Sequence, residues 1–158
     1  MPSFPRPSFT YNYQVDIEIN NLRNYQNTAS GRAIPSKSSN RILIATWNIA
    51  NLGLQDRNDS DYQLIAEMIS WFDMVALQEV NDNLIGLRSI KKYLPSSFKV
   101  VFSDKAGNNE RLAFLYDTTD DKITLLEKFG EIAVPPKDHK DIKLPKIQQK
   151  FTVLIETI

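Results

Sequence analysis

The sequence of 158 residues contains no cysteine, which excludes disulfide bonds, thiolate metal sites and cysteine nucleophiles. Any metal ion would therefore be held by oxygen or histidine ligands, and the chain has a single histidine. No apolar run approaches the roughly 20 residues that a membrane helix requires, so we expect no membrane span. The N-terminus has neither a secretory nor a transit-peptide pattern, and the simplest expectation is a cytoplasmic protein.

Net charge is also absent, because 19 basic residues balance 19 acidic residues. Nucleic-acid binders usually carry a basic excess or a basic patch, so this balance argues against a non-specific nucleic-acid binder. Hydrophobic residues make up 42% of the chain and charged residues 24%, which is typical of an ordinary globular domain. The length suits a single hydrophobic core.

Residues 1–40 are rich in proline, serine and asparagine, and we interpret them as a flexible N-terminal extension. Within this extension, residues 13–19 alternate between apolar and polar side chains. Two interpretations are open: an added edge strand, or a short amphipathic stretch that binds nothing. The rest of the chain, residues 41–158, forms the predicted domain.

A strand, a helix and a second strand open this domain. Residues 41–49 are β-branched and apolar, which predicts a buried strand, and the polar residues up to Asp59 predict a loop. A helix capped by Asp59 or Ser60 follows. Its apolar side chains recur at helical spacing: Leu64, Ile65, Met68, Ile69 and Phe72. Residues 74–77 predict the second strand, parallel to the first after a right-handed crossover, so that the carboxyl ends of both strands share one edge.

The pattern then changes to a helix and a run of strands. A helix is expected from about Asp82, and Pro95 ends it. Residues 98–102 and 112–116 predict two strands of a hairpin, because the connection between them is rich in turn residues. Trp47, Phe114 and Tyr116 are assigned to the core, since an aromatic side chain in a buried strand usually packs. Helices and strands in this order predict an α/β fold.

The final third of the chain is less regular. Residues 123–129 are expected to continue the meander, residues 134–141 form a charged loop, and residues 151–155 form a last strand. The loop contains the only histidine, His139, which we interpret as a solvated surface side chain.

Two polar side chains, Asn48 and Glu79, stand at the ends of the two buried strands. Burying them without partners would be costly. Ligands of open α/β sheets bind at the carboxyl edge of the strands, and an amide oxygen beside a carboxylate suits Mg²⁺. The pattern alone favours a structural interpretation: Asn48 caps the following loop, and Glu79 pairs with a lysine or caps the helix near Asp82.

Three blocks of sequence resemble the endonuclease/exonuclease/phosphatase superfamily. The first is ILIATWNIANLG at residues 42–53 and the second is DMVALQEV at residues 73–80, in the order and spacing of the family's opening motifs. The third, NERLAFLY at residues 109–116, resembles the deoxyribonuclease-like branch, in which a glutamate precedes an apolar strand. The resemblance implies that residues 41–158 are an incomplete domain, the N-terminal half of a four-layer α/β/β/α sandwich with mixed sheets.

The resemblance also assigns roles to individual residues. Glu79 would be a metal ligand and Asn48 the amide that holds the metal or its water, with Mg²⁺ as the cofactor and Mn²⁺ or Ca²⁺ as alternatives. Glu110 would be a catalytic residue that orients a histidine by accepting its ring proton. Arg111 and Asn81 are candidate substrate-binding residues, since a guanidinium suits phosphate oxygens. For Arg111 an ordinary exposed strand residue, and for Asn81 a helix cap, are the structural alternatives.

Several parts of the family's site are missing from the sequence. The family carries its catalytic histidine, an Asp-x-Asn pair and a terminal Asp-His pair on later strands, and the pair Asp138-His139 does not match the last of these because it lies in the charged loop. The leading hypothesis is a metal-dependent phosphodiesterase that cleaves DNA in its full-length form, with this chain inactive alone. The alternatives are a phosphoesterase acting on lipids or small phosphoesters, and a non-catalytic interaction module or fragment. An exposed apolar sheet face would favour association with another copy or with a missing C-terminal half.

Overall fold

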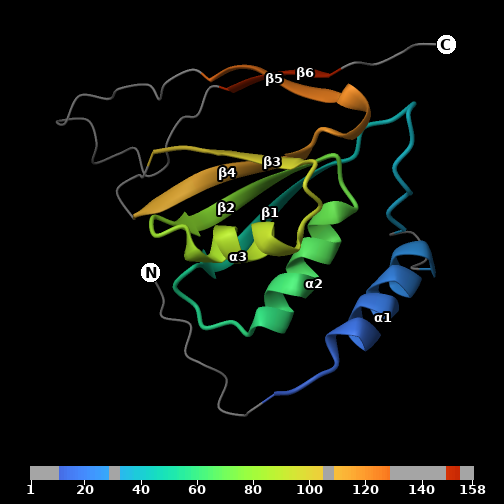
Figure 1. Cartoon of the computed structure of the whole chain (residues 1–158), viewed down its shortest axis with the longest axis vertical. Helices are drawn as coiled ribbons and strands as arrows, with labels where there is room; N and C mark the ends of the chain where they lie inside the picture. The colour runs from blue at the N-terminus through green and yellow to red at the C-terminus, as the bar shows by residue number, and fades with distance from the viewer. Residues whose placement is uncertain (1–10, 29–32, 105–108, 129–148, 154–158) are drawn as a thin grey trace.

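The structure is a computed structural model that describes residues 11–28, 33–104, 109–128 and 149–153. Its centre is a four-stranded sheet with the order β1-β2-β4-β3 (Figure 1). The strands of this sheet are β1 (Ile44–Leu52), β2 (Met74–Asn81), β3 (Phe98–Phe102) and β4 (Glu110–Asp117). Because β1 and β2 are parallel while β4 runs antiparallel to β2 and β3, the sheet is mixed. The predicted α/β class is confirmed.

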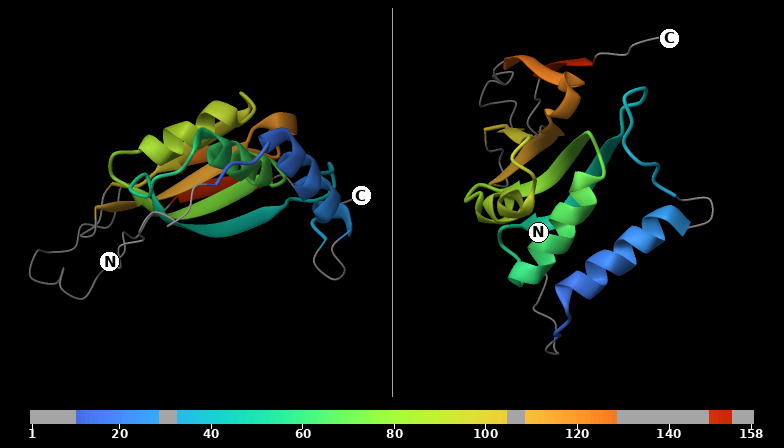
Figure 2. Two further views of the ribbon diagram at one scale, coloured as in Figure 1. Left: turned by 90° about the horizontal axis from the view of Figure 1, so that it is seen from below. Right: turned by 45° about the vertical axis from the view of Figure 1, so that its right-hand side comes forward.

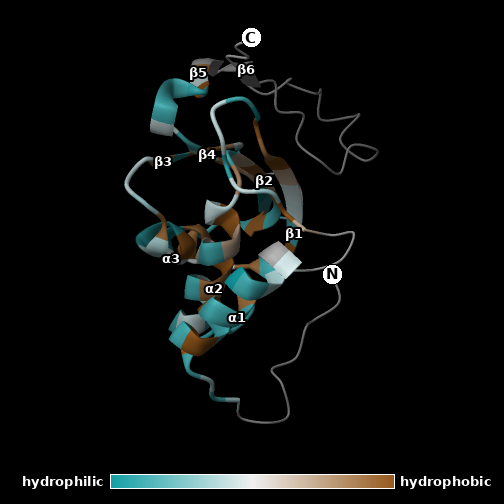
Figure 3. Cartoon of the chain, turned by 90° about the vertical axis from the view of Figure 1, so that its right-hand side faces the viewer, coloured by the Kyte–Doolittle hydropathy of each residue, from teal (hydrophilic) through white to brown (hydrophobic). Residues whose placement is uncertain are grey.

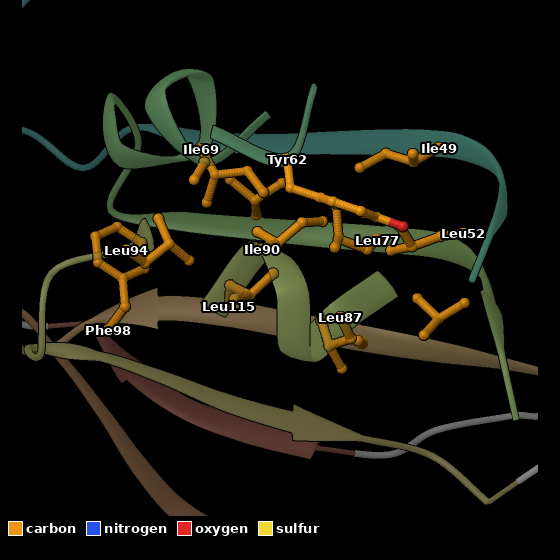
Figure 4. Close-up of a cluster of buried hydrophobic side chains, with 14 residues drawn as sticks. Ile49, Leu52, Tyr62, Ile69, Leu77, Leu87, Ile90, Leu94, Phe98 and Leu115 are labelled. Atoms are coloured by element: carbon orange, nitrogen blue, oxygen red, sulfur yellow. The ribbon is translucent and has the colours of Figure 1, made fainter. Parts of the chain in front are cut away.

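Two helices, α2 (Asp59–Ser70) and α3 (Ile85–Tyr93), cover one face of the sheet (Figures 1 and 2). The hydrophobic core lies between these helices and the strands (Figure 4). Its buried members are Ile49, Leu52, Tyr62, Ala66, Ile69, Val75, Leu77, Val80, Leu87, Ile90, Leu94, Phe98, Ala113 and Leu115. Trp47 packs against this core and Tyr116 is buried, as predicted, whereas Phe114 is half-buried.

The predicted strand–helix–strand unit is present, but its boundaries differ from the prediction. β1 begins at Ile44 and continues to Leu52, so the residues expected to open a loop belong to the strand. The reason is burial: Leu52 is fully buried and pairs with Val80 of β2. The parallel pairing places the carboxyl ends of β1 and β2 at one edge of the sheet, as expected.

The first turn of α2 is built differently from the prediction. Asn58, not Asp59 or Ser60, is the N-cap residue, and its backbone amide donates to the Asp61 carboxylate at 2.7 Å. The side chains that α2 buries most deeply are Tyr62, Ala66 and Ile69, which share one helix face. The buried face therefore begins at Tyr62, two residues before the first position of the predicted stripe.

The possible edge strand at residues 13–19 is wrong, because the helix α1 (Val15–Thr28) occupies this segment. Val15, Ile19 and Leu22 are spaced to share one helix face, and each is partly buried. α1 lies beside α2, on the side away from α3 (Figures 1 and 2), and its outward-facing residues are mainly hydrophilic (Figure 3). The alternation of apolar and polar side chains over only seven residues did not distinguish a strand from a helix.

Ion pairs and hydrogen bonds hold α1 and the residues before it against α2. Arg23 contacts both oxygens of Glu67, at 2.7 and 2.9 Å. The hydroxyl groups of Tyr11 and Tyr13 donate to the Asp61 carboxylate at 2.6 and 2.5 Å. Burial and the bond to Asp61 raise the pKa of Tyr13 to about 12. The docking is thus largely polar.

The helix predicted from about Asp82 begins later, at Ile85, and ends at Tyr93, just before Pro95 as predicted. The delay comes from a turn in which Leu84 has a left-handed φ of 57°. Near this turn the backbone of α3 approaches the end of β1 closely, since a Cβ on Gly86 would lie 2.8 Å from the Gly53 nitrogen. Glycine at position 86 permits this contact.

The predicted β3–β4 hairpin is present, but the meander does not continue as expected. β5 (Ile123–Lys128) pairs with β6 (Gln149–Val153) in a separate two-stranded sheet. A short 3₁₀ segment, η1 (Thr119–Asp121), turns the chain away from β4, with left-handed φ values at Asp120 and Asp121. The loop at residues 134–141 and its His139 lie outside the described residues, as do residues 154 and 155 of the expected last strand.

The opposite edge of the sheet, where β1 and β2 begin, is closed by a buried ion pair. Lys122 Nζ lies 2.9 Å from Asp73 Oδ1, and both side chains are buried. Asp73 Oδ2 also accepts from the Leu43 amide at 2.7 Å. Among the described residues, no helix is long and apolar enough to cross a membrane.

Candidate functional site

The candidate site lies at the edge of the sheet where β1 and β2 end. β4 is antiparallel to β2, so it begins at this same edge, and Glu110 pairs with Asn81 in the ladder. Asn48, Glu79 and the first residue of β4 therefore lie at the same edge of the sheet. The sequence predicted this convergence for Asn48 and Glu79 from strand direction alone.

The carboxylate of Glu79 is held by two hydrogen bonds. Asn48 Nδ2 donates to Oε1 at 2.9 Å, and the backbone amide of Asn51 donates to Oε2 at 3.1 Å. Glu79 is half-buried and Asn48 is exposed, so solvent reaches the pair. Because Asn48 donates this hydrogen bond through its amide nitrogen, its Oδ1 atom remains available as an oxygen ligand for a metal ion.

The backbone is irregular on both strands at this point. Asn48 pairs with Gln78 and Leu52 with Val80, so the segment of residues 49–51 lies opposite Glu79 alone. We call residues 49–51 the bulged segment. Glu79 and Asn51 have left-handed φ values of 55° and 49°. A non-glycine residue in this region costs roughly 1–3 kcal/mol, and such strain tends to cluster at functional sites.

The structural interpretations offered for Glu79 do not describe what it contacts. None of the ion pairs within the described residues includes Glu79. The backbone amide of Ile85, the first residue of α3, donates to Asn83 Oδ1 at 2.8 Å and not to Glu79. The proposed metal roles of Asn48 and Glu79 stay predictions, but the geometry is compatible with them.

Glu110 has an unusual environment for a carboxylate. Its Oε1 atom is buried and has no hydrogen-bond partner among the described residues. Leaving a buried acceptor unpaired costs roughly 1–3 kcal/mol. A donor from outside these residues, or a water molecule, would therefore complete this site.

Arg111 is engaged within the protein. Its Nη2 and Nε donate to Asp82 Oδ1 at 2.5 and 3.1 Å, and its Nη1 donates to the carbonyl of Ser103 at 2.5 Å. The guanidinium carbon lies 5.6 Å from the centre of the Phe102 ring. The Arg111 side chain is only 16% exposed, so it is not the ordinary exposed strand residue offered as an alternative.

Asn81 is buried and forms a turn rather than capping the helix. Its Oδ1 accepts from the Asn83 amide at 3.2 Å, while Asn83 Nδ2 donates to the Gly53 carbonyl at 3.0 Å. Asn83 is therefore the side chain that joins the end of β1 to the start of α3. Contact of Asn81 or Arg111 with a substrate stays a prediction.

Sequence reasoning missed four residues that shape this site: Asn51, Arg57, Asp82 and Asn83. Asn83 carried a recognisable signal, since asparagine shortly before a helix often bonds its first amides. Asn51 bonds Glu79 through its backbone amide, and Arg57 donates to the carbonyl of Ala50, seven positions earlier in the chain. No spacing in the sequence identifies either contact.

The donor set suits Mg²⁺ only in part. Within the described residues no group of three or more histidine, aspartate or glutamate side chains is placed to hold a metal ion. Mg²⁺ is commonly bound by one or two carboxylates and otherwise by water and substrate phosphate, so Glu79 with Asn48 Oδ1 is compatible with such a site.

No protein-family model matches the chain, but it is similar to a protein of known sequence and to a solved structure. The chain is 32% identical over 90 residues to a protein from Thioalkalivibrio sp. (strain K90mix) named deoxyribonuclease, covering 52% of this chain and 24% of that protein. A crystal structure of a functionally unknown conserved protein from Enterococcus faecalis V583 has a similar fold, with a TM-score of 0.50 and 20% identity. That match covers 73% of this chain and 48% of the other, so this chain spans about a quarter and about half of the two proteins.

Proposed function

We propose that this chain provides one side of a Mg²⁺-dependent phosphodiesterase site that acts on DNA, within the endonuclease/exonuclease/phosphatase superfamily. The observation that carries the proposal is the convergence of Asn48, Glu79 and Glu110 at one edge of the sheet, with Glu79 fixed by two hydrogen bonds. The similarity to a protein named deoxyribonuclease supports DNA as the substrate.

Asn48 and Glu79 are the residues that would hold the ion. When bound, Mg²⁺ would polarise a phosphoryl oxygen and stabilise the charge that develops on it. The Asn51 amide and the Asn48 side chain keep the Glu79 carboxylate in one orientation, and such supporting bonds tune metal sites. Glu79 has a left-handed backbone, and its side chain accepts both hydrogen bonds from the end of β1.

Glu110 would hold a proton donor beside the scissile phosphate. Its buried and unpaired Oε1 can accept an N–H, which would fix the tautomer and orientation of a histidine supplied by a later part of the domain. Arg111 would hold Asp82 in place and would not bind a phosphate group, because its guanidinium already donates to Asp82 and to the Ser103 carbonyl.

A non-catalytic module is the second candidate function. It is favoured by the same shortage of ligands, since within the described residues no cluster of three or more metal-ligating side chains is present. A module of this kind would have the same structure at the carboxyl edge of the sheet, but its Glu79 would bind no metal ion.

Titration calorimetry with Mn²⁺, together with a DNA-cleavage assay with and without EDTA, tests the proposal on the 158-residue chain. We expect Mn²⁺ binding that is lost in Glu79→Gln and kept in Glu18→Gln, a matched change on α1. Cleavage that needs both metal and Glu79 would show that the chain is active alone, whereas binding without cleavage supports one side of a larger site. Binding that is absent, or that ignores Glu79→Gln, would contradict the metal site and favour the module.

A further inference from the structure

Arg57 contacts the bulged segment from outside the candidate site. Its Nη2 donates to the carbonyl of Ala50 at 2.8 Å. Ala50 is the central residue of the bulged segment, with Asn48 and the Asn51 amide on either side of it. The same Nη2 donates to Gln55 Oε1 at 2.7 Å, which fixes the direction of the guanidinium.

The backbone of Arg57 is anchored to a rigid element. Arg57 precedes Asn58, the N-cap of α2, and the bond from the Asn58 amide to Asp61 closes the first turn of that helix. α2 in turn buries Tyr62 and Ile69 in the core. The Arg57 side chain therefore links a well-packed helix to the strained backbone that surrounds the Glu79 carboxylate.

Stability alone does not account for this guanidinium. Its Nη1 atom is buried and has no hydrogen-bond partner among the described residues. Burying a cationic N–H without a partner is costly, and a smaller polar residue in the loop would avoid that cost. A requirement for the contact with Ala50 explains why an arginine is placed there.

We propose that Arg57 is a positioning residue for the Asn48–Glu79 site. By fixing the Ala50 carbonyl it holds the bulged segment in the conformation that points the Asn51 amide and the Asn48 side chain at Glu79. The inference rests on the proposed function, because it assigns Arg57 to the metal site. A planar guanidinium can bond Ala50 and Gln55 together with a defined geometry, whereas an ammonium group is less directional.

The test compares Arg57→Ala, Arg57→Lys and a control, Arg41→Ala, which removes the same charge before the other end of β1. Mn²⁺ affinity is measured by titration calorimetry, and hydrogen exchange of backbone amides by NMR. We expect Arg57→Ala to weaken Mn²⁺ binding by about 10-fold or more, the usual effect of losing a supporting residue. The Asn51 amide should exchange faster while the core amide of Leu77 does not, and Arg57→Lys should recover part of both effects.

Unchanged Mn²⁺ affinity and unchanged Asn51 exchange in Arg57→Ala would overturn the inference while leaving the metal site intact. Faster exchange at Leu77 and Asn51 alike, with no specific loss of Mn²⁺, would also overturn it, because a purely structural role has that signature. If Arg57→Ala does not fold, the same readouts on Arg57→Lys decide. Absence of Glu79-dependent Mn²⁺ binding in the unmodified chain would instead refute the proposed function, and this role with it.

Discussion

Asn48 Nδ2 lies 2.9 Å from Glu79 Oε1, across the point where the ladder between the two parallel strands loses its register. A regular ladder would place both side chains at fixed positions along their strands. The bulged segment instead places the Asn51 amide within hydrogen-bond distance of the same carboxylate. The strand ends therefore bring together polar groups from residues that are far apart in sequence.

Replacing Asn48 by aspartate tests whether this pair can hold a cation. We expect Asn48→Asp to lower the melting temperature in EDTA, because two carboxylates then face each other in place of a hydrogen bond. Mn²⁺ should restore the melting temperature by binding between them. Differential scanning fluorimetry with and without Mn²⁺ measures both effects. Thr46→Asp adds the same charge two residues earlier and should show no recovery; equal recovery in both variants would contradict the prediction.

Arg111 should behave as a structural residue. Its partly buried bonds to Asp82 and the Ser103 carbonyl predict that Arg111→Ala lowers the free energy of unfolding by roughly 1–3 kcal/mol, because an acceptor and a carboxylate lose their donor. Arg88→Ala, an exposed change on α3, serves as the control and should cost less than about 0.5 kcal/mol. Urea unfolding measures both. An Arg111→Ala variant with an unchanged free energy of unfolding but weaker, salt-dependent DNA binding would instead support a contact between Arg111 and phosphate.

The stability of the chain should depend on pH through Asp117. Burial acts to raise the pKa of Asp117, but the bonds from Lys37 and Thr119 outweigh it and lower the pKa from 3.8 to about 2. Because the folded-state pKa is the lower one, the stabilisation is present above the unfolded value and is lost as pH falls toward 2. Its size is about 2 kcal/mol at most.

Removing Lys37 tests this dependence. We expect Lys37→Ala to reduce the free energy of unfolding at neutral pH, and the difference from the unmodified chain to shrink as the Asp117 carboxylate is protonated. Urea unfolding over the acid range gives the measurement, with Lys99→Ala on the exposed side of β3 as control. A constant difference at every pH would show that Lys37 acts by packing on Phe98, whose ring centre lies 4.9 Å from its ammonium group.

The sheet face opposite α2 and α3 should mediate association. Ile44 is 58% exposed there, and the paired positions Ala76 and Phe114 lie on the same face. Ala76 and Phe114 are half-buried, and apolar side chains that are wholly or partly exposed on one face favour burial against another surface. Light scattering should therefore show species larger than a monomer, and Ile44→Lys should shift them toward monomer. A monodisperse monomer for the unmodified chain would rule this association out.

Much of the fold could be predicted because its signals are local. The runs that became β1 and β2 are apolar, Pro95 disfavours helix in the residue before it, and parallel strands of one sheet that are joined by a helix end at one edge. For the same reason Asn48 and Glu79 could be expected to meet. The errors arose where patterns were short, as at residues 13–19, or where tertiary contacts decided, as at β5.

The sequence by itself determined the order of the strands and helices along the chain from β1 to β4 and the polar residues at the carboxyl edge of the sheet, because hydrophobic periodicity and chain direction are encoded locally. Only the tertiary structure decided how that edge is built. The left-handed backbone of Glu79, the amide of Asn51 and the bond from Arg57 to Ala50 depend on a break in strand register. A register break depends on how Leu52 and Val80 pack between strand and helix, and no single stretch of sequence carries that information.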